Sequence, residues 1–272
     1  MKRAPHSTHD PQGFVSLVGA GPGDPELLTL KALRAIERAE VVVFDRLVSE
    51  AVLELVPPAA HMVDVGKRAG WHPVPQDTIN DLLVIHARAG HTVARLKGGD
   101  PFLFGRGGEE AIALRAAGVR FEVIPGITAA QGCAAQLCVP LTHRTLATGV
   151  RFVTGHARAD ATLDLDWDGL ADAATTLVVY MGLSSIPEIA ERLVSAGRSP
   201  ATPVLAVSRG TTPQAQVIGS TLGRLAADVA ASDLPTPTLF IIGEVTSLAS
   251  VRLDHAHAMV EKLLDEQLVA AE

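Results

Sequence analysis

A glycine-rich segment at residues 98–110 constrains the fold of this chain more than any other feature. It reads Gly-Gly-Asp-Pro-Phe-Leu-Phe-Gly-Arg-Gly-Gly-Glu-Glu and holds five glycines among 13 residues. Because glycine loses the most conformational freedom on folding, this density indicates unusual backbone dihedral angles or close contact with a ligand. The segment follows a predicted strand at residues 91–96 and precedes a predicted helix at 109–117. A glycine-rich turn between a strand and a helix is typical of ligand sites in open α/β sheets.

The composition is that of a globular protein whose main partner is not nucleic acid. The chain has 272 residues, 47% of them hydrophobic, and a net charge of −7. That charge argues against nucleic-acid binding, and no apolar run approaches the roughly 18–20 residues of a membrane span. Residues 1–13 are polar, so we expect a disordered tail of a cytoplasmic protein, not a signal peptide or an anchor. Basic residues in the predicted loops favour an anionic ligand; they are Arg46, Lys67, Arg68, Lys97, Arg106 and Arg144.

Neither the cysteines nor the histidines form a metal-binding pattern. Cys133 and Cys138 are five apart in a segment that is predicted to be helical, so they lie on different faces and a disulfide or zinc site is not expected. We expect both to be small buried hydrophobic residues. The ten histidines are scattered, and we predict no metal site.

Strands and helices alternate along the chain, which predicts two α/β lobes with mainly parallel sheets and an active site in the cleft between them. The predicted strands are 14–18, 41–44, 62–65, 93–96, 121–124, 151–154, 176–180, 203–207, 214–218 and 238–242. The predicted helices are 27–38, 77–89, 109–117, 127–137, 186–196 and 222–230. With a boundary at Pro125-Gly126, we expect a disordered N-terminal tail at 1–13, an N-terminal lobe at 14–125, a C-terminal lobe at 126–248 and a C-terminal helical tail at 249–272.

The first glycine motif, Gly-Ala-Gly-Pro-Gly-Asp at residues 19–24, is spaced like a dinucleotide fingerprint, with Asp45 after the second strand. Two residues argue against that interpretation. Pro22 has no N–H to offer a pyrophosphate, and Asp24 would repel one. We expect Asp24 to cap a helix that has Pro25 and Glu26 in its first turn.

Seven motifs, taken in order, resemble those of the S-adenosylmethionine-dependent tetrapyrrole methylase family. The resemblance covers about residues 14–248. Seven motifs in a fixed order are far more specific than one, and those at 45–49 and 98–110 are most similar to the members that methylate uroporphyrinogen III. The motifs lie at residues 19–24, 45–49 (Asp-Arg-Leu-Val-Ser), 65–67 (Val-Gly-Lys), 98–110, 125–129 (Pro-Gly-Ile-Thr-Ala), 142–144 (Thr-His-Arg) and 180–182 (Tyr-Met-Gly).

The resemblance implies a homodimeric methyltransferase that binds S-adenosylmethionine between two lobes and releases S-adenosylhomocysteine. It implies methylation of uroporphyrinogen III at C2 and C7, which gives precorrin-2 for sirohaem, cobalamin or haem d1 synthesis. The nucleophile is a ring carbon of the substrate, so the enzyme mainly has to align the reactants and exclude water. The implied cofactor contacts are Pro22, Gly98, Gly99, Asp100, Leu103, Thr128, Ala129, Met181 and Gly210. We expect Asp100 to accept hydrogen bonds from a ribose or an ammonium group, or else to cap local N–H groups.

The resemblance also implies three catalytic candidates. Asp45 matches a proton acceptor, Lys67 matches a proton donor, and Arg106 is placed to orient or deprotonate the substrate. An arginine base needs a strongly lowered pKa, because its usual pKa is above about 12. We therefore expect Arg106 to anchor a carboxylate first. Structural alternatives stay open: a strand-end turn for Asp45, a surface charge for Lys67, and an ion pair of Arg106 with Glu109.

A substrate with many carboxylates needs several guanidinium groups, since each can bind a carboxylate through two parallel hydrogen bonds. Arg46, Arg106 and Arg144 stand in three separate motifs, and we expect Glu109 and Met181 to complete the substrate contacts. We expect Phe102 to Phe104 to pack the turn between the cofactor and substrate halves of the glycine-rich segment.

Three other functions remain as alternatives. One is a related corrinoid-pathway methylase that acts on a later ring intermediate. The second is a nucleotide-dependent oxidoreductase that uses the motif at 19–24 with Asp45, and the third is a tetrapyrrole carrier without activity. Because the first motif starts near residue 14, we expect a stand-alone methylase, not one fused to a dehydrogenase and chelatase module.

Overall fold

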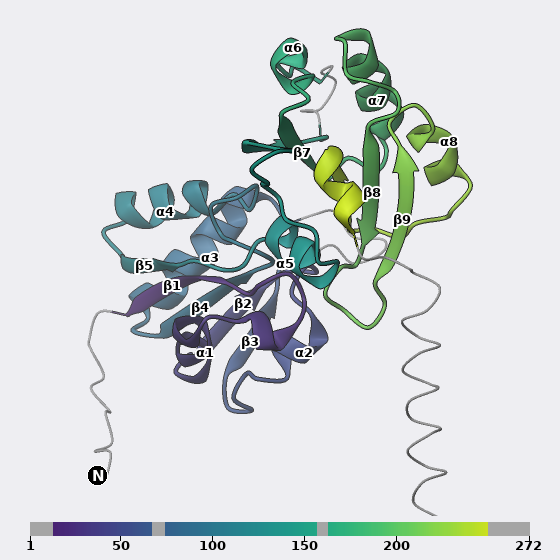
Figure 1. The fold of residues 1–272 in the computed structure, drawn as a ribbon. Coiled ribbons are helices and arrows are strands. Elements are labelled where there is room, and N and C mark those ends of the chain that lie inside the picture. The colour runs from purple at the N-terminus through teal and green to yellow at the C-terminus, as the bar shows by residue number, and fades with distance from the viewer. Residues whose placement is uncertain (1–12, 67–73, 157–162, 250–272) are drawn as a thin grey trace, which may run out of the picture. The chain divides into compact units, whose positions relative to one another are not determined.

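The structure, a computed structural model, describes residues 13–66, 74–156 and 163–249 (Figure 1). It divides into two compact units, Met1–Gly132 with Gly210–Pro213, and Cys133–Arg209 with Gln214–Glu272. This division comes after Gly132, whereas the predicted lobes, 14–125 and 126–248, meet at residue 125. Those lobes remain a proposal for the domain boundaries. The predicted tails at 1–13 and 249–272 lie outside the described residues, except for Gly13 and Ala249.

The first unit contains a five-stranded sheet in the order β3-β2-β4-β1-β5. Every neighbouring pair is parallel, which confirms the prediction for this half of the chain. Because all strands run the same way, their carboxyl ends meet at one edge of the sheet, and the predicted motifs of this unit follow these ends. The strands are β1 (Phe14–Gly19), β2 (Val41–Phe44), β3 (His61–Asp64), β4 (Thr92–Lys97) and β5 (Arg120–Ile124).

Helices cover both faces of the first sheet, which explains the continuous apolar runs of its strands. Val43 and Val93 face a core shared with α3 and α4. Val42 and Leu96 face the opposite core, shared with α1 and α2. In Figure 1 the two pairs of helices lie on opposite sides of the sheet. The helices are α1 (Leu30–Glu37), α2 (Glu50–Leu53), α3 (Gln76–Arg88) and α4 (Gly107–Ala116).

The first predicted helix, 27–38, is interrupted in the structure. A 3-10 turn, η1 (Pro25–Leu27), is followed by extended backbone before α1 starts. The break is stabilised by Thr29, whose side chain accepts a hydrogen bond from the N–H of Ala32 at 3.1 Å as the cap of α1. Asp24 caps η1 by accepting from the N–H of Glu26 at 2.8 Å, as predicted.

The second unit contains a five-stranded sheet in the order β6-β7-β10-β8-β9. Here the prediction of a mainly parallel sheet is wrong. Only β6 and β7 are parallel among its described pairs; β10 runs antiparallel to both its neighbours, and β8 and β9 are antiparallel. The α/β class itself is confirmed. The strands are β6 (Gly149–Thr154), β7 (Thr175–Tyr180), β8 (Pro203–Ser208), β9 (Gln216–Thr221) and β10 (Thr238–Ile242).

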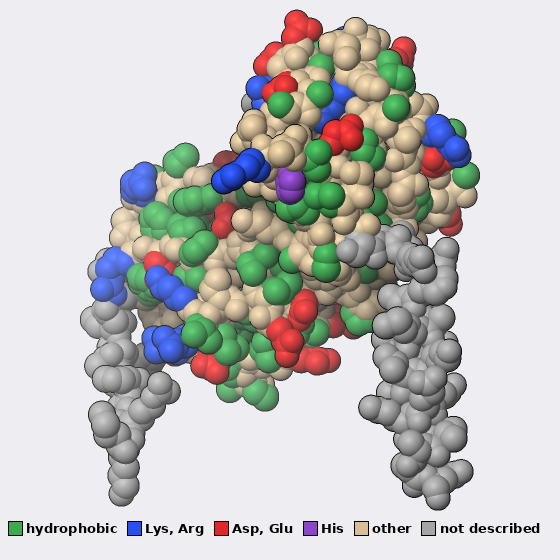
Figure 2. All heavy atoms as spheres, in the orientation of Figure 1, with side chains coloured by type: hydrophobic (Ala, Val, Ile, Leu, Met, Phe, Trp, Pro, Cys, Tyr) green, Lys and Arg blue, Asp and Glu red, His purple; other side chains and the backbone are tan. Residues whose placement is uncertain are grey.

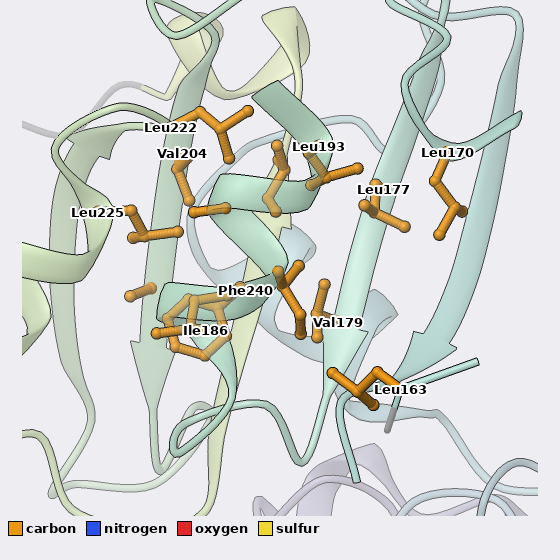
Figure 3. Close-up of a cluster of buried hydrophobic side chains, with 14 of the residues drawn as sticks. Leu163, Leu170, Leu177, Val179, Ile186, Leu193, Val204, Leu222, Leu225 and Phe240 are labelled. Atoms are coloured by element: carbon orange, nitrogen blue, oxygen red, sulfur yellow. The ribbon is translucent and has the colours of Figure 1, made fainter. Parts of the chain in front are cut away.

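One face of this second sheet packs against three helices. Figure 3 shows Leu193 of α7 beside Leu177 of β7, with Phe240 of β10 next to Ile186. Burial of each such side chain contributes about 1.5–3 kcal/mol, so this cluster is a principal source of the stability of the unit. The helices of this part of the chain are α5 (Ala129–Gln136), which crosses from one unit to the other, α6 (Trp167–Leu170), α7 (Ile186–Ser195), α8 (Leu225–Ala230) and the 3-10 helix η2 (Glu244–Leu248).

The two cysteines are free and differ in burial. Cys133 is buried, as predicted, and burial raises its pKa to about 12. Cys138 is exposed, so the prediction that both are buried is wrong. It follows α5 with a φ of 54°, where the chain turns out of the helix. None of the helices in the described parts of the chain is long and apolar enough to cross a membrane.

Candidate functional site

Four glycines pack backbone against backbone at the carboxyl edge of the first sheet. Gly21 and Gly99 form a short antiparallel bridge, in which the N–H of Gly99 donates to the carbonyl of Gly21 at 2.7 Å. A Cβ on Gly19 would lie 2.8 Å from the carbonyl oxygen of Gly99, and one on Gly126 would lie 2.8 Å from the Cα of Gly19. Both distances are shorter than real side chains tolerate. At these positions the glycines therefore allow close contact with other backbone segments of the same unit.

Asp100 fixes the turn that follows these glycines. Its Oδ1 accepts from the N–H of Phe102 at 2.8 Å, and its Oδ2 accepts from the N–H of Gly126 at 3.1 Å. Asp100 thus caps local N–H groups, which is the structural role that the sequence left open for it. Each carboxylate oxygen can accept more than one hydrogen bond, so this role leaves capacity for a ligand.

The other predicted cofactor residues of the first unit lie around this turn. A Cβ on Gly99, whose φ is 68°, would lie 3.7 Å from the Cα of Thr128 and 3.8 Å from the nitrogen of Ala129. The N–H of Leu103 donates to the carbonyl of Asp100 at 3.3 Å.

Pro22 and Gly210 belong to a neighbouring set of contacts in the same unit. The ring of Pro22 packs against Gly132 of α5. A Cβ on Gly23 would lie 3.6 Å from the carbonyl oxygen of Gly210, so the segment at 210–213 closes over the first glycine motif. Met181 follows β7 in the second unit, is half exposed and has a φ of 54°.

Arg106 caps the start of α4 with a left-handed backbone, at a φ of 60°. Its guanidinium donates from Nε to Oε2 of Glu109 at 2.8 Å and from Nη2 to Oε1 at 3.0 Å. This hydrogen bonding raises the pKa of Arg106 and lowers the pKa of Glu109, although both side chains are at least half exposed. A guanidinium with a raised pKa does not suit a base, whereas its charge suits an anchor for carboxylates.

The expected packing of Phe102 to Phe104 inside the turn is wrong. Phe102 is exposed over 59% of its surface and Phe104 over 37%. The hydrogen bonds of Asp100 hold the turn, and both aromatic residues lie at the surface.

Asp45 follows β2 and is the outer member of a line of charges. Its Oδ2 accepts from Nη2 of Arg95 at 3.1 Å, and its Oδ1 accepts from the N–H of Leu47 at 3.0 Å. Behind it, Nε of Arg95 donates at 3.1 Å, and Nζ of Lys97 at 2.9 Å, to the same Oε1 of Glu110. Sequence reasoning missed Arg95, Lys97 and Glu110 as a unit. The available signal was two cations two apart in a buried strand, and so on one face of it.

The remaining predicted residues are not all brought together. Arg46 is an exposed residue of the first unit, beside Gly66. Arg144 is an exposed residue of the second unit, and Lys67 lies outside the described residues. In Figure 2 basic and acidic side chains are interspersed over the visible face of both units. No group of three or more His, Cys, Asp or Glu in the described residues has a metal-binding arrangement.

Comparison with known proteins identifies the family of this chain. The family Tetrapyrrole (Corrin/Porphyrin) Methylases matches residues 15–226, most of the chain. The chain belongs to the tetrapyrrole methylase family. It is 56% identical over 237 residues to the uroporphyrinogen-III C-methyltransferase of Paracoccus denitrificans, which covers 87% of this chain and 83% of that protein.

Two further relatives of this tetrapyrrole methylase extend the comparison. The siroheme synthase of Azotobacter vinelandii is 56% identical over 236 residues, and the chain spans 51% of its length. Among solved structures, uroporphyrin-III C-methyl transferase from Thermus thermophilus complexed with S-adenyl homocysteine matches with a TM-score of 0.74 and 44% identity. That match covers 87% of this chain and all of the Thermus chain (100%). The two-sheet α/β fold is thus the fold of this family.

Several residues of this methylase with left-handed backbone lie in its family motifs or beside Gly210. Phe104 and Arg106 have φ of 54° and 60° in the glycine-rich segment, and Met181 has a φ of 54°. Arg209 and Thr211, at 47° and 64°, flank Gly210. Such conformations cost about 1–3 kcal/mol each for residues other than glycine and cluster at functional sites.

Proposed function

We propose that this tetrapyrrole methylase transfers methyl groups from S-adenosylmethionine to C2 and C7 of uroporphyrinogen III and so forms precorrin-2. The observation that carries the proposal is the 56% identity to the Paracoccus uroporphyrinogen-III C-methyltransferase, over 83% of its length. The Thermus relative of the same name was solved with S-adenyl homocysteine, which supports this choice of cofactor.

The residues of the first unit fit an adenosylmethionine ligand. Gly99 presents backbone without a Cβ atom beside Thr128 and Ala129, and Asp100 keeps acceptor capacity for a hydroxyl or an ammonium group. When bound, the sulfonium group supplies the methyl group that is transferred. We assign its contacts to Pro22, Gly98, Gly99, Asp100, Leu103, Thr128, Ala129, Met181 and Gly210.

Asp45 is the proton acceptor in this proposal. Methylation of a ring carbon leaves a proton to be removed and a tautomeric shift to be completed, and a positioned carboxylate can accept that proton. Asp45 is suited to this role because its side chain is 27% exposed while both its oxygens are fixed by hydrogen bonds. Lys67 remains the proposed proton donor on the basis of its motif.

Substrate binding falls to the exposed arginines. Arg46, Arg106 and Arg144 supply guanidinium groups for the carboxylates of the tetrapyrrole, and Glu109 orients Arg106. Met181 completes the proposed set as an apolar contact. This arrangement explains how an acidic chain, with a net charge of −7, can bind an acidic substrate.

The proposal includes assembly and pathway. We propose a cytoplasmic homodimer whose product feeds sirohaem, cobalamin or haem d1 synthesis. Light scattering after size-exclusion chromatography tests the dimer: about twice the chain mass of 28.4 kDa is expected, and the single chain mass contradicts it.

Titration calorimetry tests the class of cofactor. We expect S-adenosylmethionine to bind and NAD to give no heat of binding. Binding of NAD alone would contradict the proposal and favour an oxidoreductase. Turnover of methyl-labelled S-adenosylmethionine with uroporphyrinogen III then separates an enzyme from a carrier, because a carrier transfers no label.

A further inference from the structure

Four charged side chains form a continuous line from the interior of the first unit to its surface. Arg95 and Lys97 lie on one face of β4, and Glu110 of α4 accepts hydrogen bonds from both. These three side chains are buried. Asp45, at the end of the neighbouring strand β2, is the only member of the line that reaches solvent to a substantial extent, with 27% of its side chain exposed.

The guanidinium of Arg95 is fixed at each of its nitrogens. Its Nε donates to Glu110, its Nη1 donates to the carbonyl of Leu96 at 2.9 Å, and its Nη2 donates to Asp45. The planar guanidinium therefore has one orientation. Since Oδ1 of Asp45 is held by the N–H of Leu47, the plane of that carboxylate is also set at both oxygens.

Stability alone does not account for this line of charges. Within the described residues Oε2 of Glu110 is buried without a hydrogen-bond partner, while its Oε1 accepts from Arg95, Lys97 and Gln76. Burial, together with the charge of Arg95, lowers the pKa of Lys97 below its usual value. Buried ion pairs often contribute no more to stability than apolar residues of similar size, and unpaired buried polar atoms are costly. A role in holding the partly exposed carboxylate of Asp45 in one orientation would explain why these buried charges are present.

We propose that Glu110 and Lys97 hold Arg95 in place, and that Arg95 in turn orients Asp45 for proton transfer, so that all three are positioning residues for this carboxylate. The inference rests on the proposed function, in which Asp45 accepts a proton from the methylated ring. Lys97 and Glu110 act at one remove, through Arg95.

A double-mutant cycle in the full-length enzyme tests this coupling. The variants are Asp45→Asn, Arg95→Gln, Glu110→Gln, and Asp45→Asn combined with each of the other two. The readouts are kcat and KM for methyl transfer to uroporphyrinogen III, the Kd of S-adenosylmethionine and the midpoint of thermal unfolding. Glu110→Gln keeps the shape and the Oε1 acceptor of the side chain, so it provides the second cycle if Arg95→Gln does not fold.

Arg198 offers a matched control in the second unit. It is as deeply buried as Arg95 and donates to the carbonyls of Leu170, Thr175 and Ile242. Arg198→Gln and Arg95→Gln should both lower the midpoint of thermal unfolding. Its effect on kcat should multiply with that of Asp45→Asn, because the two residues share no partner.

We expect Asp45→Asn and Arg95→Gln each to lower kcat at least tenfold, with a smaller change in KM. The kcat of the double variant should lie within about threefold of the kcat of the slower single variant. Glu110→Gln should lower kcat less than Arg95→Gln, and its combination with Asp45→Asn should likewise be no slower than Asp45→Asn alone within about threefold. The inference would be overturned if the losses of kcat in Arg95→Gln and Asp45→Asn multiplied in the double variant. A normal kcat for Asp45→Asn would also overturn it. A wild-type enzyme that transfers no methyl group would overturn the proposed function as well, whereas an active wild-type enzyme with independent effects overturns this inference alone.

Discussion

Arg106 and Glu109 form a two-point ion pair at the first turn of α4, with hydrogen bonds of 2.8 and 3.0 Å. The pair holds the guanidinium charged and in one orientation. This geometry combines the two interpretations left open by the sequence, since an ion pair within the motif can also present Arg106 to a carboxylate.

Replacement of Arg106 should affect the tetrapyrrole and not the cofactor. We expect Arg106→Ala to raise KM for uroporphyrinogen III about tenfold or more, because a charge-assisted contact to a carboxylate contributes about 1.5–3 kcal/mol. The Kd of S-adenosylmethionine by calorimetry should change less than threefold. Arg88→Ala is a control, since Arg88 donates to the carbonyl of Ala117 on the same unit. Equal weakening of both ligands would contradict the substrate role.

Replacement of Asp100 should show the opposite selectivity. Asp100→Ala removes the acceptor for the N–H groups of Phe102 and Gly126, so the turn beneath the proposed cofactor site loses its two ties. We expect the Kd of S-adenosylmethionine to rise more than tenfold and the free energy of unfolding to fall by about 1–3 kcal/mol. Asp100→Asn keeps one acceptor oxygen and should lose less of both. A normal Kd of S-adenosylmethionine for Asp100→Ala would contradict a role of Asp100 in cofactor binding.

The glycine contact at the sheet edge predicts opposite effects for two alanine substitutions. Gly126→Ala forces a Cβ against the backbone of Gly19 and Gly99, and should lower the free energy of unfolding by about 1–3 kcal/mol. Gly108→Ala places a Cβ in open space within α4, where alanine is preferred by about 0.5–1 kcal/mol, and should stabilise the protein. Urea denaturation measures both. Equal effects of the two substitutions would contradict the packing described.

A histidine cluster at the opposite edge of the first sheet predicts a pH dependence of stability. The ring of His86 lies 6.1 Å from that of His61 and 5.8 Å from that of His91. Burial, followed by the charges of His91 and His61, lowers the pKa of His86 below 6.5. The unfolded chain therefore binds a proton more readily than the folded one. This contribution to stability is complete above about pH 6.5 and decreases as the pH falls below it.

Urea denaturation of wild type and His86→Gln at pH 7.5 and 5.5 measures this contribution. We expect the loss of stability between the two pH values to be smaller in His86→Gln than in wild type. His156→Gln, in the second unit, should retain the wild-type loss. The same loss in all three proteins would show that His86 makes no such contribution.

Much of the first unit could be predicted because interior strands such as β2 are buried on both faces and read as short apolar runs between helices. The direction of the strands in the second sheet could not. Runs such as residues 203–207 and 238–242 look alike whether a neighbouring strand is parallel or antiparallel, since pairing depends on contacts distant in sequence. The break before α1 was missed because Thr29, a good cap, lies within an otherwise helical pattern.

The sequence motifs named solvent-accessible residues of the candidate site and did not single out the buried charges behind them. The motifs drew attention to Asp45, Asp100 and Arg106, and the structure shows their hydrogen bonds. Arg95 and Glu110 were not predicted because, although the spacing of Arg95 and Lys97 places both on one face of the strand, nothing in the sequence shows that α4 packs on that face and buries them. Lys97, assigned to a basic loop, is likewise buried at the end of β4.

The number of methyl groups that the enzyme adds to its substrate tests the central claim most directly. Uroporphyrinogen III is incubated anaerobically with the protein and methyl-labelled S-adenosylmethionine, and the mass of the tetrapyrrole product is measured. The proposed function predicts a product that carries two labelled methyl groups, at C2 and C7. A tetrapyrrole recovered without label, under conditions in which S-adenosylmethionine binds the protein, would contradict it.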